Sequence, residues 1–243
     1  MKLLIGLFYT IVFISNSFSQ SAVIGDKWDA LDDKIINSTI DEDEAIELMY
    51  SYEPLLKKYF YKNNGITVAR QNWVFPLKNF TSIYYREKGN DYREDKYDYF
   101  QGSNTKGHPA HDIMILDSNK DLFDDITLSP VDVVSMSSGV VVATDSTWEP
   151  GSLLRGGKYV KIFDVNNNGL FYYSHLSNVN VRPGDIVNAG DKIGEVGRTG
   201  RKAIAPSGKT HLHVAFLRFE EGYPIPEDII DDLRRSEKNL IKK

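Results

Sequence analysis

The chain has 243 residues, of which 41% are hydrophobic and 26% are charged, and its formal net charge is -5 at pH 7. This composition is ordinary for a soluble globular protein, and the negative balance gives no reason to expect a nucleic-acid partner. Cysteine is absent. Disulfide bonds and thiolate metal ligands are therefore excluded, and packing must stabilise the core, with help from any bound metal.

The first 19 residues have the three parts of a secretory signal peptide. Lys2 supplies a single positive charge, an apolar run continues to Ile14, and small residues are common over 15–19. We expect cleavage near Ser19 and an exported protein, periplasmic or extracellular, without stable membrane insertion afterwards. The apolar run is short for a bilayer span, which needs ~20 residues. An uncleaved anchor is the alternative.

Residues 20–70 are predicted to form a helical N-terminal extension. The pattern is helical from 26 to 63, with an acidic start at 41–44 that suits a helix N-terminus. Pro54 predicts a boundary or a kink. Residues 71–104 are rich in turns and charges and are predicted to be an irregular connecting segment. The stretch from 64 to 107 is a candidate cover that holds a site latent.

From 108 to 219 the pattern changes to short β-branched runs separated by Gly, Asn, Asp and Pro, which predicts an antiparallel β domain. Asn168-Gly169 predicts a two-residue hairpin turn between two of these runs. Gly-Asp recurs at 184 and 190, each time before a short apolar run, which is typical of a compact barrel or sandwich. Residues 221–243 are predicted to form a short closing helix and a frayed basic tail from Lys238.

The positions of the histidines indicate a metal site. His108 and Asp112 form an H-x-x-x-D pair, His211 and His213 form an H-x-H pair, and His175 lies between them in an aromatic run. Two imidazoles and one carboxylate suit zinc and leave one coordination position open for water, as in catalytic zinc sites. In a strand, the H-x-H side chains share one face, so one can bind metal while the other stands beside the bound water.

The chain resembles the lysostaphin/LytM-type zinc metallopeptidases, which cut peptidoglycan peptides. The resemblance spans roughly 105 to 218 and includes turn glycines as well as the His and Asp positions. The matching stretches include His108-Pro109-Ala110-His111-Asp112, Tyr172-Tyr173-Ser174-His175-Leu176, Val181-Arg182-Pro183-Gly184-Asp185, Gly197-Arg198-Thr199-Gly200 and His211-Leu212-His213.

This resemblance implies a barrel-sandwich catalytic domain (a duplicated hybrid motif) over residues 105–220. It also implies one Zn2+ ion held by His108, Asp112 and His213, with His175 and His211 as the catalytic pair. The family chemistry is hydrolysis of peptide cross-links by a zinc-activated water, with one neutral imidazole accepting a proton and the other stabilising the oxyanion. Peptidoglycan peptides are then the substrate partner.

Other interpretations remain. A non-catalytic wall-binding or hydrolase-regulating module could share the fold, but such modules usually lack ligands that this chain has. A lipoyl-type carrier domain would need a presented lysine, and Lys192 fits that role poorly. His111 should face away from Asp112, which predicts a surface or supporting role. The loop from Arg198 to Lys209 is basic and should lie at the rim of the site, where Arg201 and Lys202 could attract carboxylates.

Overall fold

The structure is a computed structural model that describes residues 24–152 and 154–241. The signal peptide expected at 1–19 lies outside the described residues. None of the described helices combines the length and the apolar character needed to cross a bilayer.

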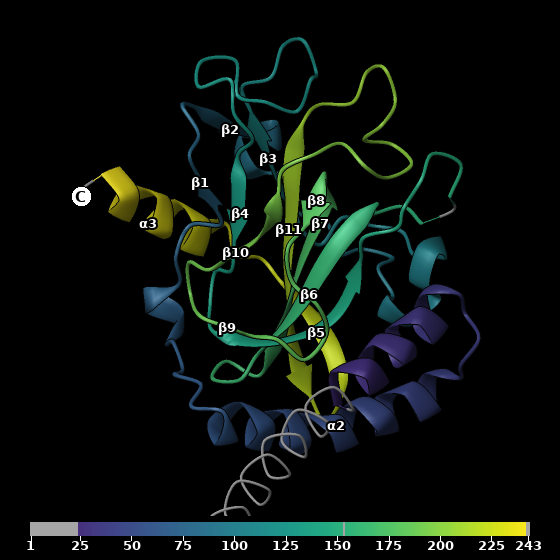
Figure 1. Cartoon of the computed structure of the whole chain (residues 1–243). Coiled ribbons are helices and arrows are strands. Elements are labelled where there is room, and N and C mark those ends of the chain that lie inside the picture. The colour runs from purple at the N-terminus through teal and green to yellow at the C-terminus, as the bar shows by residue number, and fades with distance from the viewer. Residues whose placement is uncertain (1–23, 153, 242–243) are drawn as a thin grey trace, which may run out of the picture.

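Two antiparallel sheets form the centre of the molecule (Figure 1). The larger has the order β2-β3-β11-β7-β6-β5-β9, with β12 also paired to β11, and the smaller has the order β1-β4-β10-β8. This arrangement confirms the predicted antiparallel β architecture with N-terminal helices. The strands are β1 (Leu77–Lys78), β2 (Ile83–Tyr85), β3 (His111–Ile115), β4 (Asp132–Val134), β5 (Gly139–Asp145), β6 (Lys158–Asp164), β7 (Gly169–Leu176), β8 (Asn178–Val179), β9 (Ile186–Val187), β10 (Lys192–Glu195), β11 (His211–Glu220) and β12 (Tyr223–Glu227).

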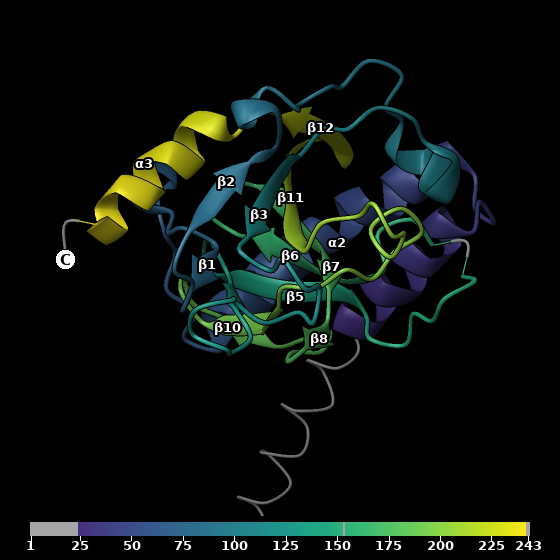
Figure 2. The same ribbon diagram turned by 90° about the horizontal axis from the view of Figure 1, so that it is seen from above.

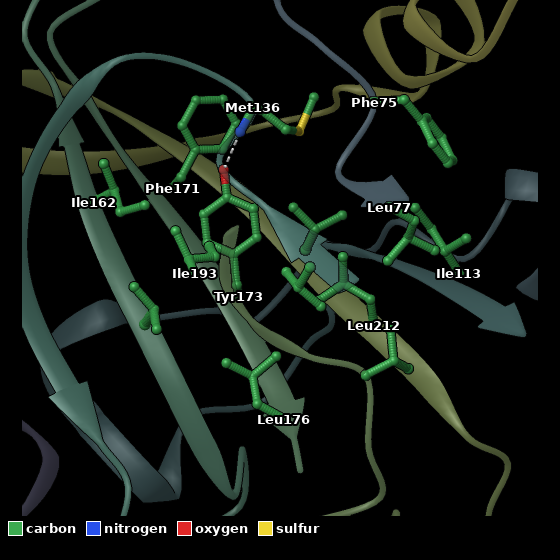
Figure 3. Close-up of a cluster of buried hydrophobic side chains, with 14 of the residues drawn as sticks. Phe75, Leu77, Ile113, Met136, Ile162, Phe171, Tyr173, Leu176, Ile193 and Leu212 are labelled. Atoms are coloured by element: carbon green, nitrogen blue, oxygen red, sulfur yellow. Dashed lines mark hydrogen bonds between the residues drawn. The ribbon is translucent and has the colours of Figure 1, made fainter. Parts of the chain in front are cut away.

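Residues of both sheets form one core, and Figure 3 shows part of it. Ile162 of β6 and Phe171 and Tyr173 of β7 are fully buried there. The Tyr173 hydroxyl accepts a hydrogen bond from the backbone N–H of Met136 at 2.9 Å (Figure 3). The buried Tyr173 hydroxyl therefore has a hydrogen-bond partner. Most residues of β6 and β7 are buried.

The N-terminal helices cover the other face of the larger sheet. The chain is helical over 24–36 and again in α2 (Glu42–Lys62), and Figure 1 shows α2 running below the sheets, while α3 (Ile230–Ile241) lies at the left; Figure 2, seen from above, has α2 behind the strands. Trp28 stacks on Phe219 with ring centroids 5.8 Å apart. Buried Asp32 forms an ion pair with Lys161 of β6 and accepts a hydrogen bond from the Tyr159 hydroxyl at 2.9 Å. The extension is thus packed into the fold by apolar and ionic contacts.

Pro54 neither begins nor ends a helix, because α2 continues through it from Glu42 to Lys62. The prediction of a boundary there was wrong, and the structure records Pro54 inside an unbroken helix. The physical reason is packing: Met49, Leu56 and Phe60 are fully buried on one face. Burial of that amphipathic face outweighs the backbone hydrogen bond that proline removes.

Two further local predictions were wrong in detail. Strands β6 and β7 do form a hairpin, but their loop has four residues (165–168), because Asp164 pairs with Gly169. The C-terminal helix begins at Ile230 and continues to Ile241, so Lys238 is helical and is not part of a frayed tail. Leu233 and Ser236 are buried on one face of α3 and hold the helix against the domain.

The segment 71–104 carries little regular structure but supplies core residues. It contains the short 3-10 helices η2 (Arg86–Gly89) and η3 (Tyr99–Asn104), and η1 (Arg70–Asn72) overlaps its start. Trp73, Phe75 and Leu77 lie in the core between the sheets. Trp73 packs edge-on against Phe171 with ring centroids 4.7 Å apart. This segment is therefore part of the folded domain.

Asp29, on the helix over 24–36, predicts a pH-dependent stability. Burial raises the pKa of Asp29 from 3.8 to about 6, although the backbone N–H of Thr144 donates to its carboxylate. Between those values the unfolded chain loses the proton while the folded chain keeps it, so stability falls as the pH rises through this window. Asp29→Asn keeps an oxygen acceptor and removes the charge. Because Asp29 is half-buried, the gain in unfolding free energy near pH 7 should be about 1 kcal/mol.

Urea unfolding of the wild type and Asp29→Asn at about pH 4 and about pH 7 checks this prediction. The gain should be present at the higher pH and absent at the lower one. Equal effects at both values would show that the carboxylate charge is not its source.

Candidate active site

Three neighbouring strands bring the predicted site residues together. In β11, His213 is paired with Asp112 of β3 on one side and with Ser174 of β7 on the other. His211 lies two residues earlier on the same face of β11, His175 follows Ser174, and His108 precedes β3. All five residues line one cleft of about 600 Å³. Strand register thus assembles positions that are up to 105 residues apart in the sequence.

His108, Asp112 and His213 form a candidate metal site. One donor atom from each lies within 4.8 Å of the others. Nε2 of His108 is 3.1 Å, and Nδ1 of His213 is 2.9 Å, from Oδ1 of Asp112. Two imidazole nitrogens and a carboxylate oxygen at this spacing can bind one divalent ion with a borderline preference for nitrogen and oxygen, so the residues present fit a zinc ion.

The two oxygens of Asp112 have different partners. Oδ1 faces the two imidazoles, whereas Oδ2 accepts a hydrogen bond from Nη1 of Arg86 at 3.0 Å. Burial alone would raise the pKa of Asp112, but the hydrogen bonds from His108 and His213 hold it far below its usual range. The carboxylate is therefore ionised at neutral pH and available as a ligand.

Three of the imidazoles donate from Nδ1 to backbone carbonyl oxygens. His108 donates to Asp91 at 2.9 Å, His175 to Thr199 at 2.7 Å and His211 to Lys209 at 2.7 Å. A carbonyl can only accept, so each Nδ1 carries a proton, and Nε2 of His175 and of His211 is left as the basic nitrogen. Both ring nitrogens of His108 face acceptors, and although burial opposes it, the hydrogen bond to Asp112 raises the pKa of His108.

The rings of His175 and His211 lie side by side with centroids 4.7 Å apart. Burial, followed by the nearby imidazoles His211 and His213, lowers the pKa of His175 well below its ordinary value. Burial also lowers the pKa of His213. Neutral imidazoles at neutral pH suit a proton acceptor at His175 and a metal ligand at His213.

The backbone at His175 is unusual. Its φ is +65°, in the left-handed region that residues other than glycine rarely adopt. Such conformations cluster at functional sites. The turn opposite requires glycine, because Gly200 has a φ of +103° and a Cβ there would lie 2.8 Å from Nδ1 of His175. This turn presents the Thr199 carbonyl to the imidazole.

Asp91 supports the metal donors and was missed by sequence reasoning. Its carbonyl accepts from His108, and its carboxylate accepts from the backbone N–H of Asp112 at 2.9 Å and faces Nδ1 of His111 at 3.0 Å. Nε2 of His111 lies 2.9 Å from Asp228. His111 is fully buried, so the surface role expected for it was wrong, while the supporting role agrees with the structure. Asp91 lies in a strongly charged stretch with no spacing motif to mark it.

Asp91→Asn should weaken binding of a divalent metal by about 10–100-fold, because groups that orient metal ligands typically have effects of this size. The amide lacks the charge and one of the two acceptor oxygens that orient the His108–Asp112 segment. Competition with a chromogenic chelator measures the affinity. Asp95→Asn, at an exposed position in the same segment, is the matched control. Unchanged affinity in a folded Asp91→Asn protein would refute the supporting role.

A family model matches the part of the chain that contains His175, His211 and His213. Residues 125–225 match the model of peptidase family M23. A structure named as a candidate glycyl-glycine endopeptidase, lytM, from Ruminococcus gnavus has a TM-score of 0.50 and 26% identity, and the match covers 70% of this chain and 63% of that chain. Residues 125–225 of the chain are therefore similar to peptidase family M23. No curated protein matches it.

Two other solved structures are similar over shorter stretches. The antimicrobial peptidase lysostaphin from Staphylococcus simulans is 26% identical, with 53% of this chain and 45% of that chain covered and a TM-score of 0.37. LytU is 30% identical, with 42% and 65% covered and a TM-score of 0.32. The chain spans less than two thirds of each of these three proteins. The M23 match includes His175, His211 and His213 but begins after Asp112, so the grouping of His108 and Asp112 with His213 rests on the geometry.

Proposed function

We propose that the chain is an exported zinc metalloendopeptidase that hydrolyses peptide cross-links of peptidoglycan. The observation that carries this proposal is the meeting of three metal donors and two further histidines in one cleft of a chain whose residues 125–225 match peptidase family M23. When bound, zinc would supply an acidified water and a Lewis acid for the amide carbonyl.

The side chains of this protein have separate roles in that reaction. His108 and His213 would hold the ion through Nε2 and Nδ1, and Asp112 through Oδ1. His175 would accept a proton at Nε2, because its Nδ1 proton is held by Thr199. His211, whose Nδ1 is held by the Lys209 carbonyl, would donate from Nε2, when that nitrogen also carries a proton, to the oxygen that becomes negative during attack on the amide.

The name of the similar structure from Ruminococcus gnavus supports the substrate class. It describes a candidate glycyl-glycine endopeptidase, an enzyme that cuts a peptide bond within a chain. Cross-linked peptidoglycan peptides lie outside the cytoplasm, which agrees with the export expected from the first 19 residues. Because the chain spans less than two thirds of that protein, its substrate and location are proposals.

A defined cross-linked muropeptide dimer tests this function. Incubation with the zinc-loaded protein should convert the dimer to two monomeric fragments, separable by reversed-phase chromatography. Chelation should stop the reaction, and His211→Ala should be nearly inactive while retaining metal. A folded, zinc-loaded wild type that leaves the dimer intact but still binds it would favour the non-catalytic wall-binding module.

A further inference from the structure

The cleft around the candidate metal site has a charge opposite to that of the whole chain. Acidic residues outnumber basic ones in the sequence, 34 to 29. Among the described residues, seven basic side chains line the cleft, and Asp112 is the only acidic one. The seven are Arg86, Arg93, Lys106, Arg155, Lys161, Lys202 and Lys209. The candidate active site is therefore positively charged, although the chain as a whole is negatively charged.

Three of these cations are already neutralised by carboxylates. Arg86 is paired with Asp112, Arg93 with Glu87 at 2.6 Å, and Lys161 with Asp32. The other four, Lys106, Arg155, Lys202 and Lys209, form no ion pair with any residue that the structure describes. Their charges are available to a ligand.

The four available cations come from three separate segments that converge on the site. Lys106 lies two residues before His108, and Lys209 lies two residues before His211 and holds that imidazole through its carbonyl. Arg155 precedes β6 and donates to the Thr105 carbonyl on the opposite side of the cleft. Lys202 belongs to the loop between β10 and β11. Arg201, expected at the rim from the sequence, does not line the cleft.

The three lysines of this set are accessible to a ligand that enters the cleft from solvent. Lys106, Lys202 and Lys209 are exposed, and Arg155 is half-buried. Clefts lined by one sign of charge focus the field and raise the local concentration of an oppositely charged ligand. Carboxylates are the anionic groups that peptide substrates carry, and lysine and arginine form charge-assisted hydrogen bonds with them.

We propose that the cleft selects peptides that carry free carboxylates near the scissile amide, in preference to uncharged glycine bridges. This inference rests on the proposed peptidase function and names the substrate class within it. An internal glycine bridge has no side-chain charge, so it would leave four cations without partners. An acidic stem-peptide cross-link would pair with them on both sides of the metal donors.

Matched substrates test the proposal directly. The zinc-loaded protein is given one synthetic cross-linked peptide with free carboxylates, the same peptide with those groups converted to amides, and a pentaglycine-bridged peptide. The ratio of kcat/KM for the free over the amidated peptide should be about tenfold or more, because a hydrogen bond to a charged group contributes at least that much. The preference should shrink as ionic strength rises, since screening weakens exposed charges.

Variants localise the effect. The double substitution Lys202→Gln and Lys209→Gln should reduce the preference for the free peptide several-fold, mainly through KM. Lys58→Gln on α2, an exposed position that does not line the cleft, is the matched control and should change nothing. Zinc content and thermal melting should be unchanged in all three proteins.

Calorimetry measures how tightly the free and the amidated peptides bind to the zinc-loaded His211→Ala protein, and this measurement separates the inference from the proposed function. Equal affinities for the free and amidated peptides would overturn the inference, whatever is cleaved. Equal cleavage of the amidated or pentaglycine substrate would overturn it too, while leaving the peptidase function standing. Preferential binding of the free peptide without cleavage of any substrate by the wild type would overturn the peptidase function and support the acidic-ligand cleft.

Discussion

Replacing His213 with alanine should leave the purified protein almost free of zinc. Three protein donors hold the proposed ion, and His213 lies at the centre of the site, opposite Asp112 and next to Ser174 in the sheet. Removal of one imidazole from a three-donor set should lower the affinity by several orders of magnitude. Activity on cross-linked peptides should fall to the background level, because both the acidified water and the Lewis acid depend on the ion.

Stability should fall with the metal. A ligand present at about 1,000 times its dissociation constant stabilises the folded state by about 4 kcal/mol, and the variant would lose this contribution. Metal analysis after dialysis and thermal melts with and without added zinc measure both effects. Adding zinc should raise the Tm of the wild type and not that of His213→Ala. Full zinc occupancy in this variant, or in His108→Ala, would show that the ligand set is wrong.

Replacing His211 with alanine should have the opposite pattern: zinc stays and the reaction stops. Its Nε2 lies 3.8 Å from Oδ2 of Asp112, beside the donor cluster, while its Nδ1 is held by the Lys209 carbonyl. General acid–base groups contribute roughly 10²–10⁴-fold to rate, so kcat should fall by that factor. For His175 the suitable variant is His175→Asn, because asparagine tolerates the positive φ at this position better than alanine.

The pH dependence follows from the lowered pKa of His175. Burial and the neighbouring imidazoles favour its neutral form. The proton acceptor is therefore present at neutral pH, and its contribution to kcat should be lost only as the pH falls below the ordinary imidazole range.

Wild-type rates in both His211→Ala and His175→Asn would rule out His175 and His211 as the catalytic pair. Loss of zinc in His211→Ala would mean that the two histidines of β11 have exchanged roles.

The His and Asp spacings and strand periodicity indicated a metal site, whereas the ligand set and the catalytic pair came from the resemblance to the lysostaphin/LytM-type peptidases. His211 and His213 must share a face of a strand, and the short apolar runs around His175 and Asp112 indicated the neighbouring strands. The structure adds the register, in which His213 is paired with Asp112. The antiparallel class was predictable for the same reason. The boundaries were not, because tertiary packing overrode the local signals at Pro54 and Asn168.

The supporting groups could not be predicted, because they act through the backbone or from irregular segments. The carbonyls of Thr199 and Lys209 orient two imidazoles, and every residue has such a carbonyl. Asp91 and Arg86 belong to a strongly charged stretch, and its sequence predicts a solvated loop. Only the fold shows that this stretch packs behind His108 and Asp112. The same holds for the convergence of Lys106, Arg155 and Lys209 on one cleft.

Mass spectrometry of purified peptidoglycan digested by the zinc-loaded protein tests the central claim most directly. The account predicts products in which a peptide amide at the cross-link has been hydrolysed, with intact glycan strands. The products should vanish on chelation, return on addition of zinc and be absent with zinc-loaded His211→Ala. Products cut only in the glycan strand, or undigested peptidoglycan after incubation with folded, zinc-loaded wild type, would contradict it.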